Sequence, residues 1–94
     1  MLTYKAMYKF LPDGVHGEVL DFAGVITCGE NLAETRNLLA GALVDMAETN
    51  LILGDALPIP NPNLTSQDSD LEEPIYLILN AAAKIETIPI YETA

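Results

Sequence analysis

The amino-acid sequence predicts an α+β fold: a two-layer sandwich in the order β-β-β-α-β, with one helix packed on one face of a mostly antiparallel sheet. Three observations predict it. Apolar and polar residues alternate along residues 2–10 with the two-residue period of a half-buried strand. Residues 32–52 place apolar side chains at helical spacing behind a good N-cap. Residues 75–79 form a continuous apolar run of strand length.

The first two strands are expected to form a hairpin. Its turn, residues 11–14, contains a proline that presets φ and a glycine that tolerates positive φ. Residues 15–22 return as the second strand, in which Gly17 marks either a bulge or a close approach. Gly24 separates this strand from a short third strand over residues 25–28.

The two faces of the first strand differ in composition. The expected core face carries Leu2, Tyr4, Ala6, Tyr8 and Phe10. On the opposite face Lys5 and Lys9 flank Met7. This second face is predicted to be either solvated or a pairing surface in an oligomer.

The helix is predicted from both of its ends. Asn31 is a good N-cap, and Glu34 stands at the third helical position, where a carboxylate favours the helix N-terminus. Gly54 supplies the C-terminal stop. The expected core stripe contains Leu32, Leu39, Leu43 and Met46, with Thr35 and Ala42 beside them.

The segment after the helix is expected to be extended and then acidic. Pro58, Pro60 and Pro62 exclude helix. An acidic loop is predicted over residues 63–74, and its carboxylates are Asp68, Asp70, Glu72 and Glu73. After the strand at 75–79, residues 81–83 are a connector. The sequence also allows a fifth strand over residues 85–91. It would be an edge strand, because Pro89 has no N–H to donate to a neighbouring strand.

Composition limits the function. The 94 residues make a single domain, 1–94, with a formal net charge of −10 and four Lys and Arg. Such a chain repels nucleic acid and anionic lipid and favours a basic protein partner. One cysteine excludes an internal disulfide, and the sequence shows no metal-type Cys/His cluster. No apolar stretch reaches the length of a membrane span, so we expect a soluble, cytoplasmic protein with no cofactor.

Catalysis is not expected. Carboxylates that could hold a metal ion are Asp13, Glu18, Asp21 and Glu30. A turn position explains Asp13 without a metal ion, and a place just before the helix cap explains Glu30. His16 is expected to be a solvent-facing residue at a strand end, and Cys28 a partly buried, inert thiol. Arg36 falls on the helical stripe near Leu43. Two readings stay open for it: a stem that covers the core edge, or a salt bridge between subunits.

One stretch resembles the HicB-like antitoxin family, whose pattern is Gly-Cys-x-Thr-x-Gly-Asp-Thr-x-Glu-Glu-Ala. Gly24, Thr27, Gly29 and Glu34 match it directly, and Asn31 stands for the threonine cap. Pro58 and Pro60 match the Pro-x-Pro that follows the helix in the family, and residues 13–14 match its Asp-Gly hairpin. Val25, Ala33, Thr35 and Ala23 depart from the pattern. The resemblance covers roughly residues 2–62.

The resemblance implies a truncated ribonuclease-H-like fold and an antitoxin that neutralises a small basic, mRNA-cleaving, HicA-like toxin by covering it. The contact residues expected for this role are Arg36, Asp68, Asp70, Glu72 and Glu73. A homo-oligomer is expected, since one helix leaves sheet edges open. Many such antitoxins carry a DNA-binding module, but the segment after Pro62 lacks its basic residues, so no separate DNA-binding domain is expected. The alternatives are a stand-alone oligomeric protein-interaction module and, least favoured, a metal-dependent nuclease.

Overall fold

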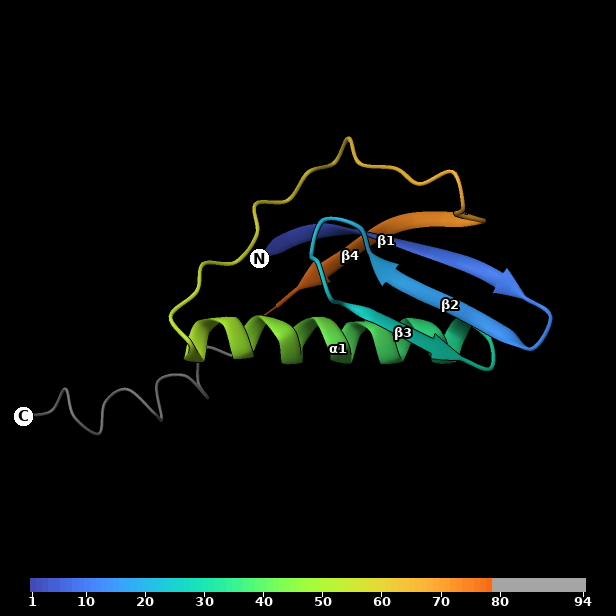
Figure 1. Cartoon of the computed structure of the whole chain (residues 1–94), viewed down its shortest axis with the longest axis horizontal. Helices are drawn as coiled ribbons and strands as arrows, with labels where there is room; N and C mark the ends of the chain where they lie inside the picture. Colours follow the sequence, from blue (N-terminus) through green and yellow to red (C-terminus); the bar gives the residue numbers. More distant parts are fainter. Residues whose placement is uncertain (79–94) are drawn as a thin grey trace, which may run out of the picture.

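The computed structural model describes residues 1–78, which form one antiparallel sheet with a single helix on one face (Figure 1). The elements are β1 (Leu2–Leu11), β2 (Gly14–Val19), β3 (Ile26–Gly29), α1 (Leu32–Ile52) and β4 (Leu71–Leu77). The order in the sheet is β3-β2-β1-β4. The predicted α+β fold and its element order are therefore confirmed. The expected connector at 81–83 and the strand at 85–91 lie outside the described residues.

β1 lies in the middle of the sheet, and its alternation decides which face the helix covers. Tyr4, Ala6 and Tyr8 are buried on the helix side, where Tyr4 pairs with Ile75 of β4 and Ala6 with Val19 of β2. Phe10 belongs to the same side by sequence period but is 50% exposed. The hairpin of β1 and β2 extends beyond the helix at this end, so the helix does not cover it (Figure 1).

α1 begins and ends where the local signals predict. The Asn31 side chain accepts a hydrogen bond from the Glu34 backbone N–H at 2.8 Å, and Gly54 follows the helix at a φ of 81°. The residues that pack on the sheet recur every fourth position: Thr35, Leu39, Leu43 and Ala47. The core stripe is therefore rotated from the predicted one, because Thr35 and Ala47 are fully buried whereas Leu32 and Met46 are only half-buried.

The N-terminal part of α1 lies close to the sheet because two glycines leave room for it. A Cβ on Gly17 would lie 2.9 Å from Thr35 Cγ2, and a Cβ on Gly29 would lie 2.5 Å from Thr35 Oγ1. The close approach predicted at Gly17 is confirmed. No bulge accompanies it, since the register of β1 with β2 runs unbroken from Ala6↔Val19 to Leu11↔Gly14.

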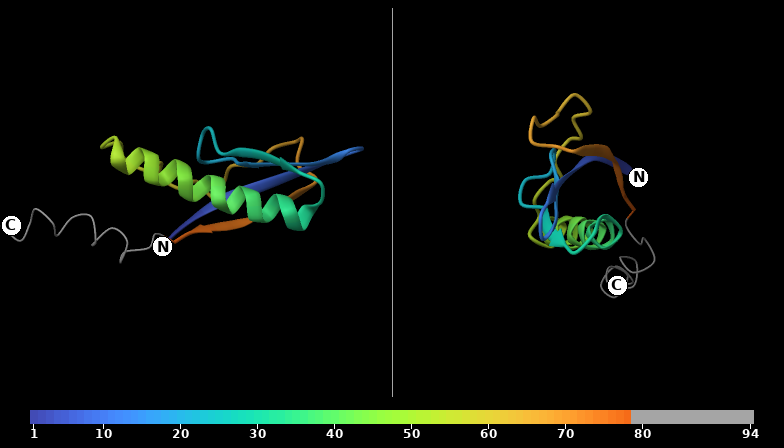
Figure 2. Two further views of the ribbon diagram at one scale, coloured as in Figure 1. Left: turned by 90° about the horizontal axis from the view of Figure 1, so that it is seen from below. Right: turned by 90° about the vertical axis from the view of Figure 1, so that its right-hand side faces the viewer.

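Residues 58–70, here called the strap, cross the sheet face that the helix does not cover. Figure 2 shows the helix, the sheet and the strap in succession. Met7 on this face is only 3% exposed, which differs from the solvated face expected around it. The acidic loop predicted over residues 63–74 is shorter in the structure, because β4 already begins at Leu71. Glu72 and Glu73 lie in that strand, opposite Met7 and Ala6 of β1.

In the sheet that residues 1–78 form, β4 is an edge strand with a proline at its centre. Pro74 lies opposite Lys5, whose N–H donates to Asp21 Oδ1 and whose carbonyl accepts from the Leu20 N–H, both toward the β2 side. Since Lys5 directs both backbone groups away from β4, the Pro74 nitrogen faces the open edge, where a missing donor costs nothing.

Candidate functional site

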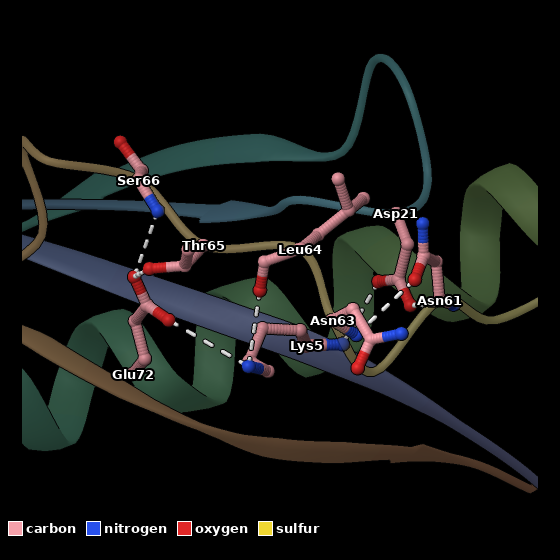
Figure 3. Close-up of polar contacts among 8 residues, drawn as sticks. All are labelled: Lys5, Asp21, Asn61, Asn63, Leu64, Thr65, Ser66 and Glu72. Atoms are coloured by element: carbon pink, nitrogen blue, oxygen red, sulfur yellow. Dashed lines mark hydrogen bonds and ion pairs between the residues drawn. The ribbon is translucent and has the colours of Figure 1, made fainter.

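The strap is held on the sheet by carboxylates that accept hydrogen bonds from backbone N–H groups (Figure 3). Asp21, in the turn after β2, accepts from the Lys5 N–H at 2.8 Å and from the Asn61 N–H at 2.9 Å. Asp21 is 9% exposed, so these hydrogen bonds compensate for the removal of a charge from water. Lys5 Nζ adds a hydrogen bond to the Leu64 carbonyl at 3.1 Å.

Glu72 holds the middle of the strap. Its Oε2 accepts from the Ser66 N–H at 2.9 Å and from the Thr65 hydroxyl at 3.0 Å, and its Oε1 lies 3.6 Å from Lys5 Nζ (Figure 3). These groups favour the charged carboxylate, the Ser66 N–H most of all, and lower the pKa of Glu72 to about 2. Glu72 is thus engaged within the chain.

Asp70 fixes the far end of the strap at the hairpin. Its Oδ2 accepts from the Phe10 N–H at 2.7 Å and lies 3.8 Å from Lys9 Nζ. Its own N–H donates to the Tyr8 carbonyl at 2.8 Å. The side chain and backbone of one residue therefore both join the strap to β1.

On the helix side, Arg36 and Glu73 form a two-pronged ion pair between α1 and β4. Arg36 Nε and Nη2 donate to the two Glu73 oxygens at 2.9 and 2.7 Å, and the guanidinium lies 5.9 Å from the centroid of the Tyr8 ring. Hydrogen bonding to Glu73 raises the pKa of Arg36. Burial, followed by the charge of Glu73, raises the pKa of Tyr8 to about 12.

The hydrogen bonds and ion pairs described above involve most of the five residues that were expected to contact a toxin. Arg36 pairs with Glu73 inside the chain and lies 5.9 Å from the ring of the buried Tyr8, a position at the core edge that agrees with the first of the two interpretations given for it. Asp70 and Glu72 anchor the strap, so four of the five residues are engaged internally. The side chain of Asp68 has no such partner. Within residues 1–78, the carboxylates without an internal ion-pair or hydrogen-bond partner are Asp13, Glu30, Asp45, Asp55 and Asp68.

The motif residues all lie where the fold needs them. Gly24 has a φ of 90° in the turn before β3, and Thr27 pairs with Gly17 in the sheet. Glu34 Oε1 accepts from the Glu30 N–H at 3.3 Å, while Asn31 caps the helix. The Pro58 carbonyl accepts from the Tyr4 hydroxyl at 2.8 Å, and Pro60 continues the strap from there. Gly29 leaves room for Thr35, as described above.

One group of reactive side chains was missed from the sequence. Cys28 lies directly opposite His16 in the pairing of β3 with β2, with 4.0 Å between Sγ and Nδ1. His16 Nε2 lies 3.1 Å from Glu18 Oε1. Cys28 is exposed rather than partly buried as expected. The period of two places His16 and Glu18 on one face, but no local signal gives the register of β3 against β2.

Residues 1–78 bring together no group of three or more His, Cys, Asp or Glu side chains with the geometry of a metal site. Their helix is neither long nor apolar enough to cross a bilayer.

No family model matches this chain, and no curated protein matches it either. Its structure is similar to that of a chain from a complex described as a HicA3 and HicB3 toxin-antitoxin complex. The two chains are 21% identical, with a TM-score of 0.57, and the alignment covers 66% of this chain and 72% of that one. At this identity the similarity shows a common fold.

Proposed function

We propose that this chain is an antitoxin-type protein that neutralises a small basic, mRNA-cleaving toxin by binding and covering it. The observation that carries the proposal is the fold shared with a chain of a toxin-antitoxin complex. That complex is described as containing two proteins, a toxin and an antitoxin, and the charge of this chain supports the antitoxin role. With a formal net charge of −10, the chain repels RNA and attracts a basic protein, which suits the neutralising partner.

The mechanism needs no bond to be made or broken by this chain. The carboxylates without an internal partner are all exposed, so a basic partner can reach them. Asp13 and Glu30 flank the point where Gly14 and Gly29 meet, since a Cβ on Gly14 would lie 2.7 Å from the Gly29 carbonyl. We expect this hairpin end to contact the toxin, and the chain to act as a protein-binding module and not as an enzyme.

The test starts from the reading frames next to the gene for this chain, among which we expect a short one rich in Lys and Arg, and it uses the product of that frame. Expressed alone, that product should arrest growth, and co-expression of this chain should restore it. The purified pair should form a complex that weakens as salt rises. An Asp13→Asn and Glu30→Gln double variant should bind about tenfold more weakly, whereas a charge-matched Asp45→Asn and Asp55→Asn variant should bind nearly as well. Failure of both rescue and complex formation would exclude the proposal.

A stand-alone oligomeric interaction module is the second candidate, and exposed apolar side chains favour it. The start of β1, the end of α1 and the end of β4 lie at the same end of the molecule (Figure 1). The exposed apolar residues of these segments include Met1, Ile52, Leu53 and Ile78. Light scattering after size-exclusion chromatography would favour this candidate if the chain alone forms a stable oligomer and ignores the basic neighbour.

A further inference from the structure

We propose that Cys28 forms reversible mixed disulfides with small disulfide compounds, with His16 as its base and Glu18 as the residue that orients His16. The inference is independent of the antitoxin role. It rests on three side chains from two neighbouring strands, and on the open groove that two of them, His16 and Glu18, line.

The sheet register creates the arrangement. Cys28 and His16 are direct partners between β3 and β2, so their side chains leave the same face of the sheet. His16 and Glu18 lie two residues apart on β2 and share that face as well. The resulting distances are 4.0 Å from Cys28 Sγ to His16 Nδ1 and 3.1 Å from His16 Nε2 to Glu18 Oε1.

Glu18 determines which nitrogen of His16 can take a proton. An ionised carboxylate only accepts hydrogen bonds, so the contact with Glu18 places the imidazole proton on Nε2. Nδ1 is then the basic nitrogen, and it is the one that faces Cys28 Sγ. The three side chains thus lie in a row: Cys28 is the nucleophile, His16 is its base, and Glu18 orients the base.

The surroundings leave the thiol and the imidazole accessible. Cys28 is exposed, and His16 and Glu18 border an open groove of about 340 Å³. The other charged groups that line this groove are Lys9 from β1 and Asp68 from the strap. Lys9 lies 3.8 Å from Asp70, so its charge is partly balanced. The groove gives a small disulfide and its departing half room beside His16.

The exchange balances without any further reagent. The Cys28 thiol proton moves to His16 Nδ1, and the thiolate attacks one sulfur of the small disulfide. A new bond forms from Cys28 Sγ to that sulfur as the original S–S bond breaks. The departing thiolate takes the proton from His16, which returns the imidazole to its neutral form. A free thiol reverses the modification by the same route.

The chain is well suited to a direct test, because Cys28 is its single cysteine. The probe is dithiodipyridine, an uncharged disulfide that releases a coloured thione, with the Cys28→Ser variant as the blank. At about pH 7 the wild-type chain should react about tenfold faster than His16→Gln. The difference should shrink at about pH 9, where a thiol ionises unaided. Circular dichroism checks the fold of each variant, and mass spectrometry should find one mixed disulfide per chain.

Substitution of Glu18 tests whether this residue acts by orienting His16 or only through its negative charge. Glu30→Gln is the matched control, since it removes the same charge two residues from Cys28. Loss of a nearby negative charge alone favours a thiolate, so Glu30→Gln should react slightly faster than the wild type. Glu18→Gln should instead react several-fold more slowly, because His16 loses its fixed tautomer. Equal rates for the wild type and His16→Gln at about pH 7, or acceleration by Glu18→Gln, would overturn the proposal.

Discussion

Glu73 accepts hydrogen bonds from Arg36 through both of its carboxylate oxygens, at 2.9 and 2.7 Å, and so joins α1 directly to β4. The strand pairs with β1, while the helix packs mainly on β2 and β3. The ion pair therefore connects the helix to a strand on which it packs less than on β2 and β3.

The first prediction concerns this ion pair. Arg36→Gln should lower the urea midpoint slightly, and Glu73→Gln should add little once Arg36 is replaced, because the two side chains act as one contact. Arg36→Lys keeps the charge but loses the second hydrogen bond, so it should fall between wild type and Arg36→Gln. Urea denaturation of the double-mutant cycle at low and high salt is the measurement. A coupling that does not weaken at high salt would contradict an electrostatic contact at a solvent-accessible site.

The second prediction compares two glycines. Gly29→Ala should destabilise the chain by about 1–3 kcal/mol, since its Cβ would lie 2.5 Å from Thr35 Oγ1 and 3.0 Å from the Thr35 backbone nitrogen. Gly41→Ala should stabilise it by about 0.5–1 kcal/mol, because a Cβ on this exposed helical residue meets nothing within 4 Å. Thermal and urea unfolding measure both, and equal effects of the two substitutions would refute the close packing of α1 on β3.

The third prediction concerns the buried anchor of the strap. Asp21→Asn replaces a carboxylate that accepts two backbone hydrogen bonds with an amide that has one acceptor oxygen. The expected loss is about 1–3 kcal/mol, and Asn61 should show faster amide hydrogen exchange than strap residues held by Glu72. Asp55→Asn is the control, since Asp55 is exposed and lies outside the strap. Unchanged exchange at Asn61 would argue against the anchor.

The fourth prediction is a loss of stability in acid. The folded chain lowers the pKa of Glu72 from 4.5 to about 2, so the charged carboxylate favours folding. This contribution is fully present above about pH 4.5 and is lost as the pH falls toward 2. Urea midpoints measured across this range should fall with pH in the wild type and fall less in Glu72→Gln. Parallel profiles for the two proteins would show that Glu72 does not hold the strap.

The sequence predicted the features that depend on neighbouring residues. Asn31 as the cap, Gly54 as the stop and the turn at residues 11–14 are local signals, and the structure has a cap, a stop and a turn at these places. Gly14 does not use its freedom to adopt a positive φ, because it already lies in β2. The period of two identified the core face of β1 for the same reason. Local chemistry also gave the order of the elements, because each break between them carries glycine or proline.

What could not be predicted depends on contacts between distant residues. Met7 looked like a surface residue because nothing in its own strand reveals that the strap passes over it. Asp70 and Glu72 looked like free charges because their partners, Phe10 and Ser66, are identified only once the strap is placed. The pairing of His16 with Cys28 depends on the irregular turn between β2 and β3, where the Val19 N–H bonds to the Val25 carbonyl.

Pro74 has a consequence for how copies of this chain could polymerise. Of the two edges formed by residues 1–78, β4 presents a proline at its centre and β3 does not. A second copy added strand to strand at β3 would leave a proline-bearing edge at both outer ends of the combined sheet. Because Pro74 disfavours the addition of a further strand at either outer edge, such a sheet would stop growing at two copies. The proline in β4 therefore favours a dimer over a filament.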